Sequence, residues 1–395
     1  MLEGVKVLNF THYLQGPSAG QTLGDLGADV VKVESLKGAY ERSWSGCNTY
    51  KNGVSVFFLM ANRNQRDLSL DLKSAEGREI IHRLVTEKGF DVVLENFRPG
   101  VMDKLGLGYE DLKKICPRVI YCSCTGYGSS GPKVAKPGQD ILIQSMSGMA
   151  ALGGPGDHPP TPAGTALVDQ HGAMLAALGI VSAVYDRSKT GKGHRIEASL
   201  LASSFDLQIE PLNYFLSGAK LSPRTDSGLC TRFHQSPYGV YRTKDSYITV
   251  SLNSFDKLKK VFSPGVLDAY TPADQMEKRV DFDKLVRDEL LKQTTKEWCE
   301  LFEAEGLWYA PVNEYDEVLK DEQVIYNDPF ITMRHPVAGE VRVLGHANKY
   351  DGKTLPLRRL PPDLGEHTAE LLREAGYSDE KISRLSKEGK VFLGK

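Results

Sequence analysis

The sequence has little of what marks secreted, metal-binding or membrane-spanning proteins. Its six cysteines form no CxxC pair and no metal-ligand spacing, and six in 395 residues do not make a disulfide framework. The longest nearly apolar run, residues 173–185, is too short to cross a bilayer. We therefore expect reduced thiols, no metal and no association with a membrane.

An excess of charge of one sign is also missing. The chain has 49 Lys and Arg residues against 51 Asp and Glu, a formal net charge of −2, which gives no reason to expect nucleic acid or an anionic membrane as a partner. The N-terminal segment carries Glu3 and alternates apolar with polar residues, which favours a first strand over a signal peptide. We expect a cytoplasmic protein that acts on small molecules.

The first third of the chain alternates strand and helix patterns. The predicted strands cover residues 5–10, 29–34, 91–95 and 119–124. One helix is expected from Pro17 and another over 75–88. Such βα units with Val- and Ile-rich strands indicate an α/β fold with a parallel sheet covered on both faces. Ligands of these sheets bind beyond the carboxyl ends of the strands.

The rest of the chain predicts further elements in a changing composition. They are a helix at 139–152, a strand at 194–200, a hairpin at 238–252 and helices at 282–292, 295–305 and 366–375. A polar stretch after Gly218 is expected to be a linker. The GxGxxG pattern at 126–131 is rejected as a dinucleotide fingerprint, because Pro132 and Pro137 interrupt where that fingerprint needs a helix.

The strongest single candidate for chemistry is Asp169. A loop rich in Gly and Pro, residues 153–164, runs towards this carboxylate, and an apolar helix pattern follows it. An aspartate at a helix start commonly caps the free N–H groups. A carboxylate aimed by a rigid loop can also act as a nucleophile. Both interpretations remain open from the residues alone.

Polar residues follow two of the predicted strands. Asn96 and Arg98 stand in the segment ENFRPG, directly after a buried strand, where a phosphate-bearing ligand would suit them. His12 ends the first strand and is a candidate acid, base or polar anchor, with a histidine bonded to nearby backbone as the alternative. His171 would be turned away from Asp169 on a helix, so a Ser-His-Asp arrangement finds no support.

Motifs along the whole chain resemble one family. They are FTHYLQGP (10–17), LGADVVKVE (26–34), SLDLKSAEG (69–77), ENFRPG (95–100), GYGSSGP (126–132), GTALVDQHG (164–172), TGKGHRIEASLL (190–201), YGVYRT (238–243), APVN (310–313) and LGEHT (364–368). Together they resemble the class III CoA-transferases, the family of formyl-CoA transferase and carnitine CoA-transferase. The matches stand in order from end to end, so they are more specific than any one motif.

The resemblance implies a fold and a domain organisation. It implies a Rossmann-like large domain with a parallel sheet, a smaller α+β domain, and a homodimer of two interlocked subunits. The expected divisions are 1–200 (large domain, CoA-binding), 201–224 (linker), 225–325 (small domain) and 326–395 (linker and return to the large domain).

The resemblance also implies a reaction. Asp169 falls on the family's nucleophilic aspartate, and the implied activity moves CoA from a donor acyl-CoA to an acceptor carboxylic acid through an aspartyl anhydride and an aspartyl-CoA thioester. CoA is then a substrate, and no permanently bound cofactor is expected. The positions implied to contact CoA or substrate are His12, Leu14, Gln15, Lys37, Leu72, Lys73, Asn96, Phe97, Arg98, Lys104, Lys136 and Gln139.

Differences between this sequence and the family limit which properties of the family can be expected of this chain. Leu14 replaces a Gln of formyl-CoA transferase, and the glycine-rich loop of that enzyme has no counterpart in residues 249–253, so oxalate is not assigned as acceptor. The related α-methylacyl-CoA racemases carry a His at the position of Gln139, whose amide cannot remove an α-proton. A racemase and an inactive acyl-CoA-binding subunit remain the alternatives.

Overall fold

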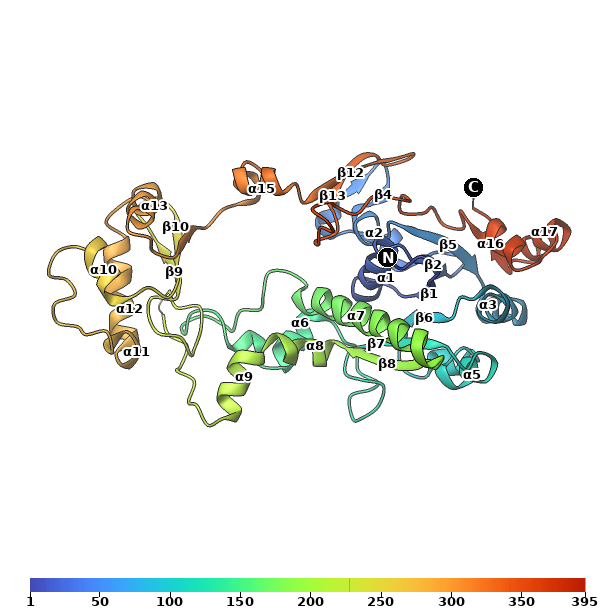
Figure 1. Ribbon diagram of the computed structural model, residues 1–395, viewed down its shortest axis with the longest axis horizontal. Coiled ribbons are helices and arrows are strands. Elements are labelled where there is room, and N and C mark those ends of the chain that lie inside the picture. Colours follow the sequence, from blue (N-terminus) through green and yellow to red (C-terminus); the bar gives the residue numbers. More distant parts are fainter. Residues whose placement is uncertain (227, 395) are drawn as a thin grey trace. The chain divides into compact units, whose positions relative to one another are not determined.

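The chain forms two compact units in the computed structural model, which describes residues 1–226 and 228–394. Unit 1 combines residues 1–143, 166–207 and 328 onwards, so that both ends of the chain contribute to it. Unit 2 consists of residues 144–165 and 208–327. Figure 1 traces the elements of each unit along the sequence.

A seven-stranded sheet forms the centre of unit 1. Its strands lie in the order β14-β5-β2-β1-β6-β7-β8. Their bounds are β1 Lys6–Phe10, β2 Asp29–Glu34, β5 Gln65–Leu70, β6 Val92–Glu95, β7 Ile120–Thr125, β8 His194–Ser199 and β14 Val391–Phe392. All pairings are parallel except that of β14 with β5. The six parallel strands follow the doubly wound order of dinucleotide-binding folds, which confirms the expected α/β class with a parallel-dominated sheet.

Both faces of this sheet are covered, as the uninterrupted apolar strands predict. Side chains alternate along β1, so Leu8 and Phe10 pack on one face and Val7 on the other. The first face is covered by α3 (Ala75–Lys88), α5 (Tyr109–Ile115), α16 (Thr368–Glu374) and α17 (Asp379–Lys387). The second face is covered by α1 (Gln15–Asp25) and α7 (Leu167–Thr190) (Figure 1).

Strand β5 is an element that the periodicity of the sequence does not predict. Its sequence QRDLSL is mostly polar, yet all six residues are buried. The polar side chains are bonded inside the fold: Asn9 Nδ2 donates to Gln65 Oε1 at 2.9 Å, and Arg42 Nη2 lies 3.2 Å from Asp67 Oδ2. Burial of polar groups is tolerated when they are paired, so this strand depends on partners distant in the sequence.

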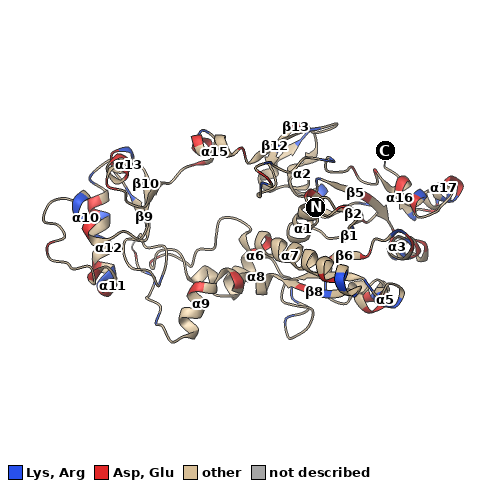
Figure 2. Cartoon of the chain, viewed as in Figure 1, with Lys and Arg blue, Asp and Glu red and all other residues tan. Residues whose placement is uncertain are grey.

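Helix α7 is longer than the apolar run at residues 173–185 from which it is predicted. Its 24 residues are long and apolar enough, by length and composition alone, to cross a membrane, which corrects the expectation drawn from residues 173–185. Figure 2 shows charged residues only towards its ends. The helix nevertheless packs on the sheet through Ala173, Ala176 and Ile180, as a core helix does.

Unit 1 also contains a further, small apolar cluster and several short elements. A short helix α2 (Val56–Ala61) and the hairpin of β12 (Phe330–His335) with β13 (Gly339–Leu344) share a small apolar cluster around Met333. A two-stranded ribbon of β3 (Tyr50–Lys51) and β4 (Val54–Ser55) precedes α2, and α4 (Val101–Lys104) follows β6.

Unit 2 is a smaller α+β body with its own core. Its sheet joins β9 (Gly239–Arg242), β10 (Tyr247–Val250) and β11 (Tyr309–Pro311), all antiparallel. Its helices are α9 (Ile209–Leu216), α10 (Phe255–Val261), α11 (Asp274–Glu277), α12 (Arg279–Leu290), α13 (Thr295–Ala304), α14 (Tyr315–Val318) and α15 (Glu322–Asn327). Trp298 is buried in this core, and its indole N–H donates to the Leu290 carbonyl at 2.8 Å.

The stretch 201–224, expected to be a linker, contains helical structure. It includes most of α8 (Leu200–Leu207), which belongs to unit 1, and all of α9, which belongs to unit 2. Apolar residues of α9 are exposed, with Phe215 61% and Leu216 71% exposed. The domain limits at 200, 225 and 325 stay predictions.

Candidate active site

The carboxyl ends of the parallel strands and the start of α7 lie on the same edge of unit 1. Because β7 and β8 are parallel, the intervening helix must run back across the sheet, and its first turn therefore begins at the carboxyl ends of the strands. That first turn contains Asp169. The fold thus brings Asp169 to the edge where ligands of such sheets bind.

Asp169 does not cap its helix. The N-cap residue of α7 is Ala166, and its side chain accepts no hydrogen bond. Instead, Asp140 Oδ2 accepts hydrogen bonds from the backbone N–H groups of Val168 at 2.7 Å and Asp169 at 3.0 Å. The capping interpretation of Asp169 is therefore wrong, and its carboxylate is left free of that role.

Asp140 is a site residue that the sequence reasoning missed. It opens α6 (Asp140–Met146), and the only local signal is an acid at the start of an apolar helix. The expected helix at 139–152 is shorter than predicted and gives way to a 3-10 turn at Met149–Ala151. The delayed start of α6 agrees with the rejection of GxGxxG as a fingerprint, since loop residues 126–139 separate the glycines from the helix.

The surroundings of Asp169 disfavour its charged form. Burial and, to a smaller extent, the nearby Asp140 carboxylate together raise the pKa of this carboxyl to about 7. A buried carboxylate has few water molecules to stabilise it, so its ionised form is a better nucleophile than an exposed one. A group poised near neutral pH at a ligand-binding edge is a typical sign of a functional site.

Two further residues expected at the site lie at the start of α1. Gln15 is buried, and its Nε2 donates to the Ala198 carbonyl, where β8 ends, at 3.3 Å. A Cβ on Gly172 would lie 2.6 Å from the same Gln15 nitrogen, so this glycine permits the close approach of α1 to α7. Leu14, also buried, precedes α1 at its N-cap position.

His12 and Asn96 meet at the point where the order of the strands reverses, between β1 and β6. Asn96 Oδ1 accepts from the His12 backbone N–H at 2.9 Å, and Asn96 Nδ2 donates to the His12 carbonyl at 2.7 Å. The His12 ring packs edge-on against Phe97, with ring centroids 5.5 Å apart. Doubly wound sheets bind their ligands at this reversal.

The surroundings of the His12 ring favour its neutral form. Burial lowers its pKa, and the Lys32 charge lowers it further. Its Nδ1 is buried and has no hydrogen-bond partner among the described residues. The alternative of a histidine held by nearby backbone therefore applies to its main chain and not to this ring nitrogen.

A buried ion pair supports the turn that follows β1. Lys32 and Glu41 are fully buried, with 3.1 Å between Lys32 Nζ and Glu41 Oε1, and Nζ also donates to the Thr11 carbonyl at 3.0 Å. Glu41 Oε2 accepts from the N–H of Tyr13, whose φ of 66° is unusual for a residue with a side chain. The pair therefore fixes the backbone on both sides of His12.

The segment ENFRPG is held by a second buried acid. Glu95 Oε2 accepts from the Phe97 backbone N–H at 2.9 Å, and burial raises the pKa of Glu95 to about 7. Phe97 and Leu72, after β6 and β5, both pack against the apolar cluster on the first face of the sheet. The structure thus brings these two expected residues into one region.

The other expected residues are exposed. They are Lys37, Lys73, Arg98, Lys104, Lys136 and Gln139, and they belong to segments that follow β2, β5, β6 and β7. Within residues 1–226 and 228–394, no hydrogen bond or ion pair joins their side chains to Asp169. The five Lys and Arg residues among them form a cationic border along the strand ends, the setting in which Arg and Lys recognise phosphate.

His171 and the cysteines take no part in this arrangement. His171 Nε2 lies 2.7 Å from Asp206 Oδ2, so its contact is not with Asp169. The six cysteines are free thiols, as expected. Among the described residues, no group of three or more His, Cys, Asp or Glu side chains has a geometry that could hold a metal ion.

The fold and this edge define an α/β protein with a poised carboxylate and a cationic border, the features of an enzyme that acts on an anionic small molecule. The family profile of CoA-transferase family III matches residues 2–368. The chain is 34% identical to succinyl-CoA:glutarate CoA-transferase of Mus musculus, over 99% of this chain and 90% of the relative. It is 31% identical to succinate–glutarate CoA-transferase of Agrobacterium fabrum, over 94% and 95%.

A solved structure agrees. The crystal structure of a CaiB/BaiF family protein from Brucella suis has a TM-score of 0.80 and 33% identity to this chain, covering 95% of this chain and 99% of that one. The chain therefore belongs to CoA-transferase family III, and it is a CoA-transferase enzyme that uses CoA thioesters as substrates.

Proposed function

We propose that this protein transfers CoA from a donor acyl-CoA to an acceptor carboxylic acid, with Asp169 as the covalent nucleophile. The observation that carries the proposal is the state of Asp169: a partly buried carboxylate at the ligand-binding edge, with Asp140 performing the capping that Asp169 would otherwise perform. Such a carboxylate can store an activated acyl group while the fold keeps water away.

The proposed reaction proceeds by four exchanges at a carbonyl carbon. An Asp169 oxygen attacks the donor thioester, giving a mixed anhydride and CoA thiolate. The thiolate attacks the Asp169 carbonyl, which releases the donor acid and forms an aspartyl-CoA thioester. The acceptor carboxylate attacks this thioester, forming a new anhydride and freeing the thiolate. The thiolate then attacks the acceptor carbonyl, giving the product acyl-CoA and regenerating Asp169.

CoA is proposed to lie along the strand ends. The exposed cations Lys37, Lys73, Arg98, Lys104 and Lys136 suit its phosphates, and His12, Asn96 and Phe97 line the reversal of strand order. Leu14, Gln15, Leu72 and Gln139 complete the proposed contacts. Gln15 is supported best among these four, because it is buried against the start of α7.

For the substrates, we propose succinyl-CoA as donor and glutarate as acceptor. Both compounds stand in the name of the mouse relative, which matches almost the whole chain. The acyl and acid groups of these substrates differ by one methylene, so exchange between them requires little net free energy. A panel of mono- and dicarboxylic acids assayed with succinyl-CoA and acetyl-CoA would rank the acceptors.

The test of the mechanism is direct detection of the covalent intermediate. After incubation with acyl-CoA and hydroxylamine, mass spectrometry is expected to find a modification at Asp169. Asp169→Ala is expected to lose CoA exchange while still binding CoA. Asp206→Ala, which removes the exposed partner of His171, is the matched control and is expected to retain exchange. A fully active Asp169→Ala protein would end the proposal.

Assays of CoA exchange and of α-deuterium incorporation separate the alternatives. A 2-methylacyl-CoA racemase would incorporate deuterium at the α-carbon, and Gln139 offers no base for that step. An inactive acyl-CoA-binding subunit would bind CoA and show no exchange with any acid. Exchange without α-deuteration is the result expected here.

A further inference from the structure

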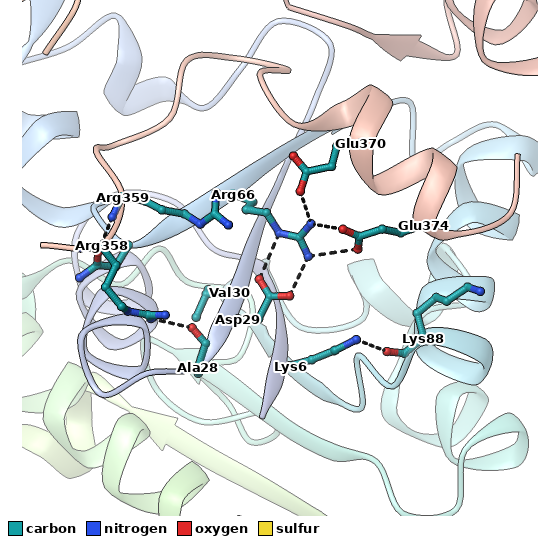
Figure 3. A pocket seen from close by; sticks show the side chains of 11 residues that line it. Lys6, Ala28, Asp29, Val30, Arg66, Lys88, Arg358, Arg359, Glu370 and Glu374 are labelled. Atoms are coloured by element: carbon teal, nitrogen blue, oxygen red, sulfur yellow. Dashed lines mark hydrogen bonds and ion pairs between the residues drawn. The ribbon is translucent and has the colours of Figure 1, made fainter. Parts of the chain in front are cut away.

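A polar cavity lies at the other edge of the sheet, away from Asp169. It has a volume of about 470 Å³ and is lined by Lys6, Ala28, Asp29, Val30, Asn64, Arg66, Lys88, Arg358, Arg359, Glu370 and Glu374, which we call the amino-end pocket (Figure 3). Lys6 and Asp29 are the first residues of β1 and β2, and Arg66 is the second residue of β5. The pocket therefore opens at the amino ends of the parallel strands.

Arg66 forms an ion pair with each of the three acids of this pocket. Its guanidinium is 95% buried as a side chain and lies 2.7 Å from Asp29, 2.8 Å from Glu370 and 2.7 Å from Glu374 (Figure 3). A buried guanidinium needs such partners, because an unpaired charge inside a protein is strongly disfavoured. The three carboxylates thus share one buried cation, and two of their negative charges remain to offset other cations of the pocket.

The other four cations of the pocket form no ion pair among the described residues. Lys6 Nζ donates to the Lys88 carbonyl at 2.9 Å, and Arg358 Nη2 donates to the carbonyls of Ala28, at 3.1 Å, and Gly24. The side chains of Lys88 and Arg359 make no hydrogen bond or ion pair within the described part of the chain. With Arg66 and the three acids counted, the lining carries five cations and three carboxylates, a net charge of +2 that favours an anionic ligand.

We propose that the amino-end pocket binds a small polyanion that carries two or more carboxylate or phosphate groups. A cavity of this volume is in the range of small-molecule sites. The cations come from β1, from the end of α3 and from the segment before α16, so a bound polyanion would link the first strands to the C-terminal part of unit 1. This site is separate from the strand edge that carries Asp169, and its occupancy does not depend on the proposed reaction.

The test is titration of the full-length protein with citrate and with pyrophosphate, followed by isothermal calorimetry. The Asp169→Ala protein is titrated in parallel, with and without saturating CoA, so that binding at the strand ends is distinguished from binding at the pocket. Saturable binding of one probe that CoA does not displace is expected. The Lys88→Ala/Arg359→Ala protein is expected to bind at least about tenfold more weakly, since it loses two of the cations that would form charge-assisted hydrogen bonds with the anion.

The matched control removes the same two charge types on α17. Lys381→Ala/Arg384→Ala changes a half-buried lysine and an exposed arginine that lie outside the pocket, and it is expected to bind as the unchanged protein does. Equal affinity of the pocket variant and this control would overturn the proposal. Displacement of the probe by CoA, or no saturable binding of either probe, would overturn it as well.

Discussion

At the scale of single residues, the division of labour between two aspartates governs the candidate site. Asp140 accepts the N–H groups at the start of α7, and Asp169 keeps a carboxylate with a pKa of about 7. The charge of Asp140 contributes to the raised pKa of Asp169. The first two predictions separate these contributions.

Asp140→Asn is expected to shift the pH dependence of exchange. The amide oxygen can still accept the α7 N–H groups, but the charge that raises the pKa of Asp169 is gone, so Asp169 ionises at lower pH. Since the ionised form attacks, the rise of kcat/KM with pH moves to lower pH. Asp186→Asn, at the far end of α7, should leave the profile in place. An unmoved midpoint in Asp140→Asn would contradict the electrostatic assignment.

Asp169→Asn is expected to stabilise the protein while abolishing exchange. The folded-state pKa of about 7 exceeds the ordinary value of 3.8, so folding of the native protein loses stability as pH rises from roughly 4 to 7 and stays lower above that. An asparagine carries no such charge. The variant should melt a few degrees higher than the native protein at pH 8 and equally at pH 4 by calorimetry. A difference that did not depend on pH would refute this linkage.

The buried pair of Lys32 and Glu41 allows a third prediction. Glu41→Gln keeps an oxygen that can accept from Lys32 but leaves the buried ammonium without a counter-charge, and urea unfolding should show a loss of about 3–5 kcal/mol. The double change Lys32→Met/Glu41→Leu should recover most of that stability, because no unpaired charge remains. If the double variant were as unstable as the single one, the pair would not be the cause.

At the scale of elements, glycines position two helices, because the absence of a side chain lets each helix approach its neighbour closely. An ideal Cβ on Gly16, in α1, would lie 2.3 Å from the Thr11 Cβ, and Thr11 is fully buried in the turn after β1. Gly172 gives α7 the same freedom against Gln15. These two contacts bring the first turns of α1 and α7 to the edge of the sheet.

Gly16→Ala is therefore expected to destabilise the protein, although alanine favours helices. The clash with Thr11 should outweigh the propensity gain of about 0.5–1 kcal/mol and leave a net loss of about 1–3 kcal/mol in urea unfolding. Gly46→Ala is the matched control, because nothing lies within 4 Å of its added Cβ. Equal stability of the two variants would show that α1 can move away from the turn.

At the scale of the whole molecule, helix α7 exposes an apolar face that unit 1 does not cover. Met174 is 44% exposed, Leu178 62% and Tyr185 64%, and their spacing puts them along one side of the helix. Exposed apolar patches of this kind mark association surfaces. We propose a second copy of this chain as the partner, in the interlocked homodimer that the resemblance implies.

Light scattering after gel filtration is expected to give twice the chain mass of 43.6 kDa. Leu178→Arg should shift the mass towards that of the monomer, since a buried unpaired guanidinium would be strongly unfavourable. Lys381→Ala, on α17 near the C-terminus, is the control and should remain dimeric. A monomeric native protein would contradict the proposed assembly.

The sequence by itself determined the pattern of βα units, the position of Asp169 at a helix start, and the segment ENFRPG after a buried strand. These follow from local rules, because apolar periodicity and the residues that end an element act over a few positions. The motifs along the chain also sufficed to indicate the family that the comparisons show.

Only the tertiary structure decided the burial of β5, the cap of α7 and the amino-end pocket. β5 is polar in sequence and becomes a buried strand because Asn9 and Arg42 satisfy it from elsewhere in the chain. Asp140 takes over the cap of α7 from 28 positions upstream of Val168, and the amino-end pocket joins residues from both ends of the chain. In each case a buried polar or charged group is stabilised by a partner far away in the sequence, and no local pattern encodes such a pairing.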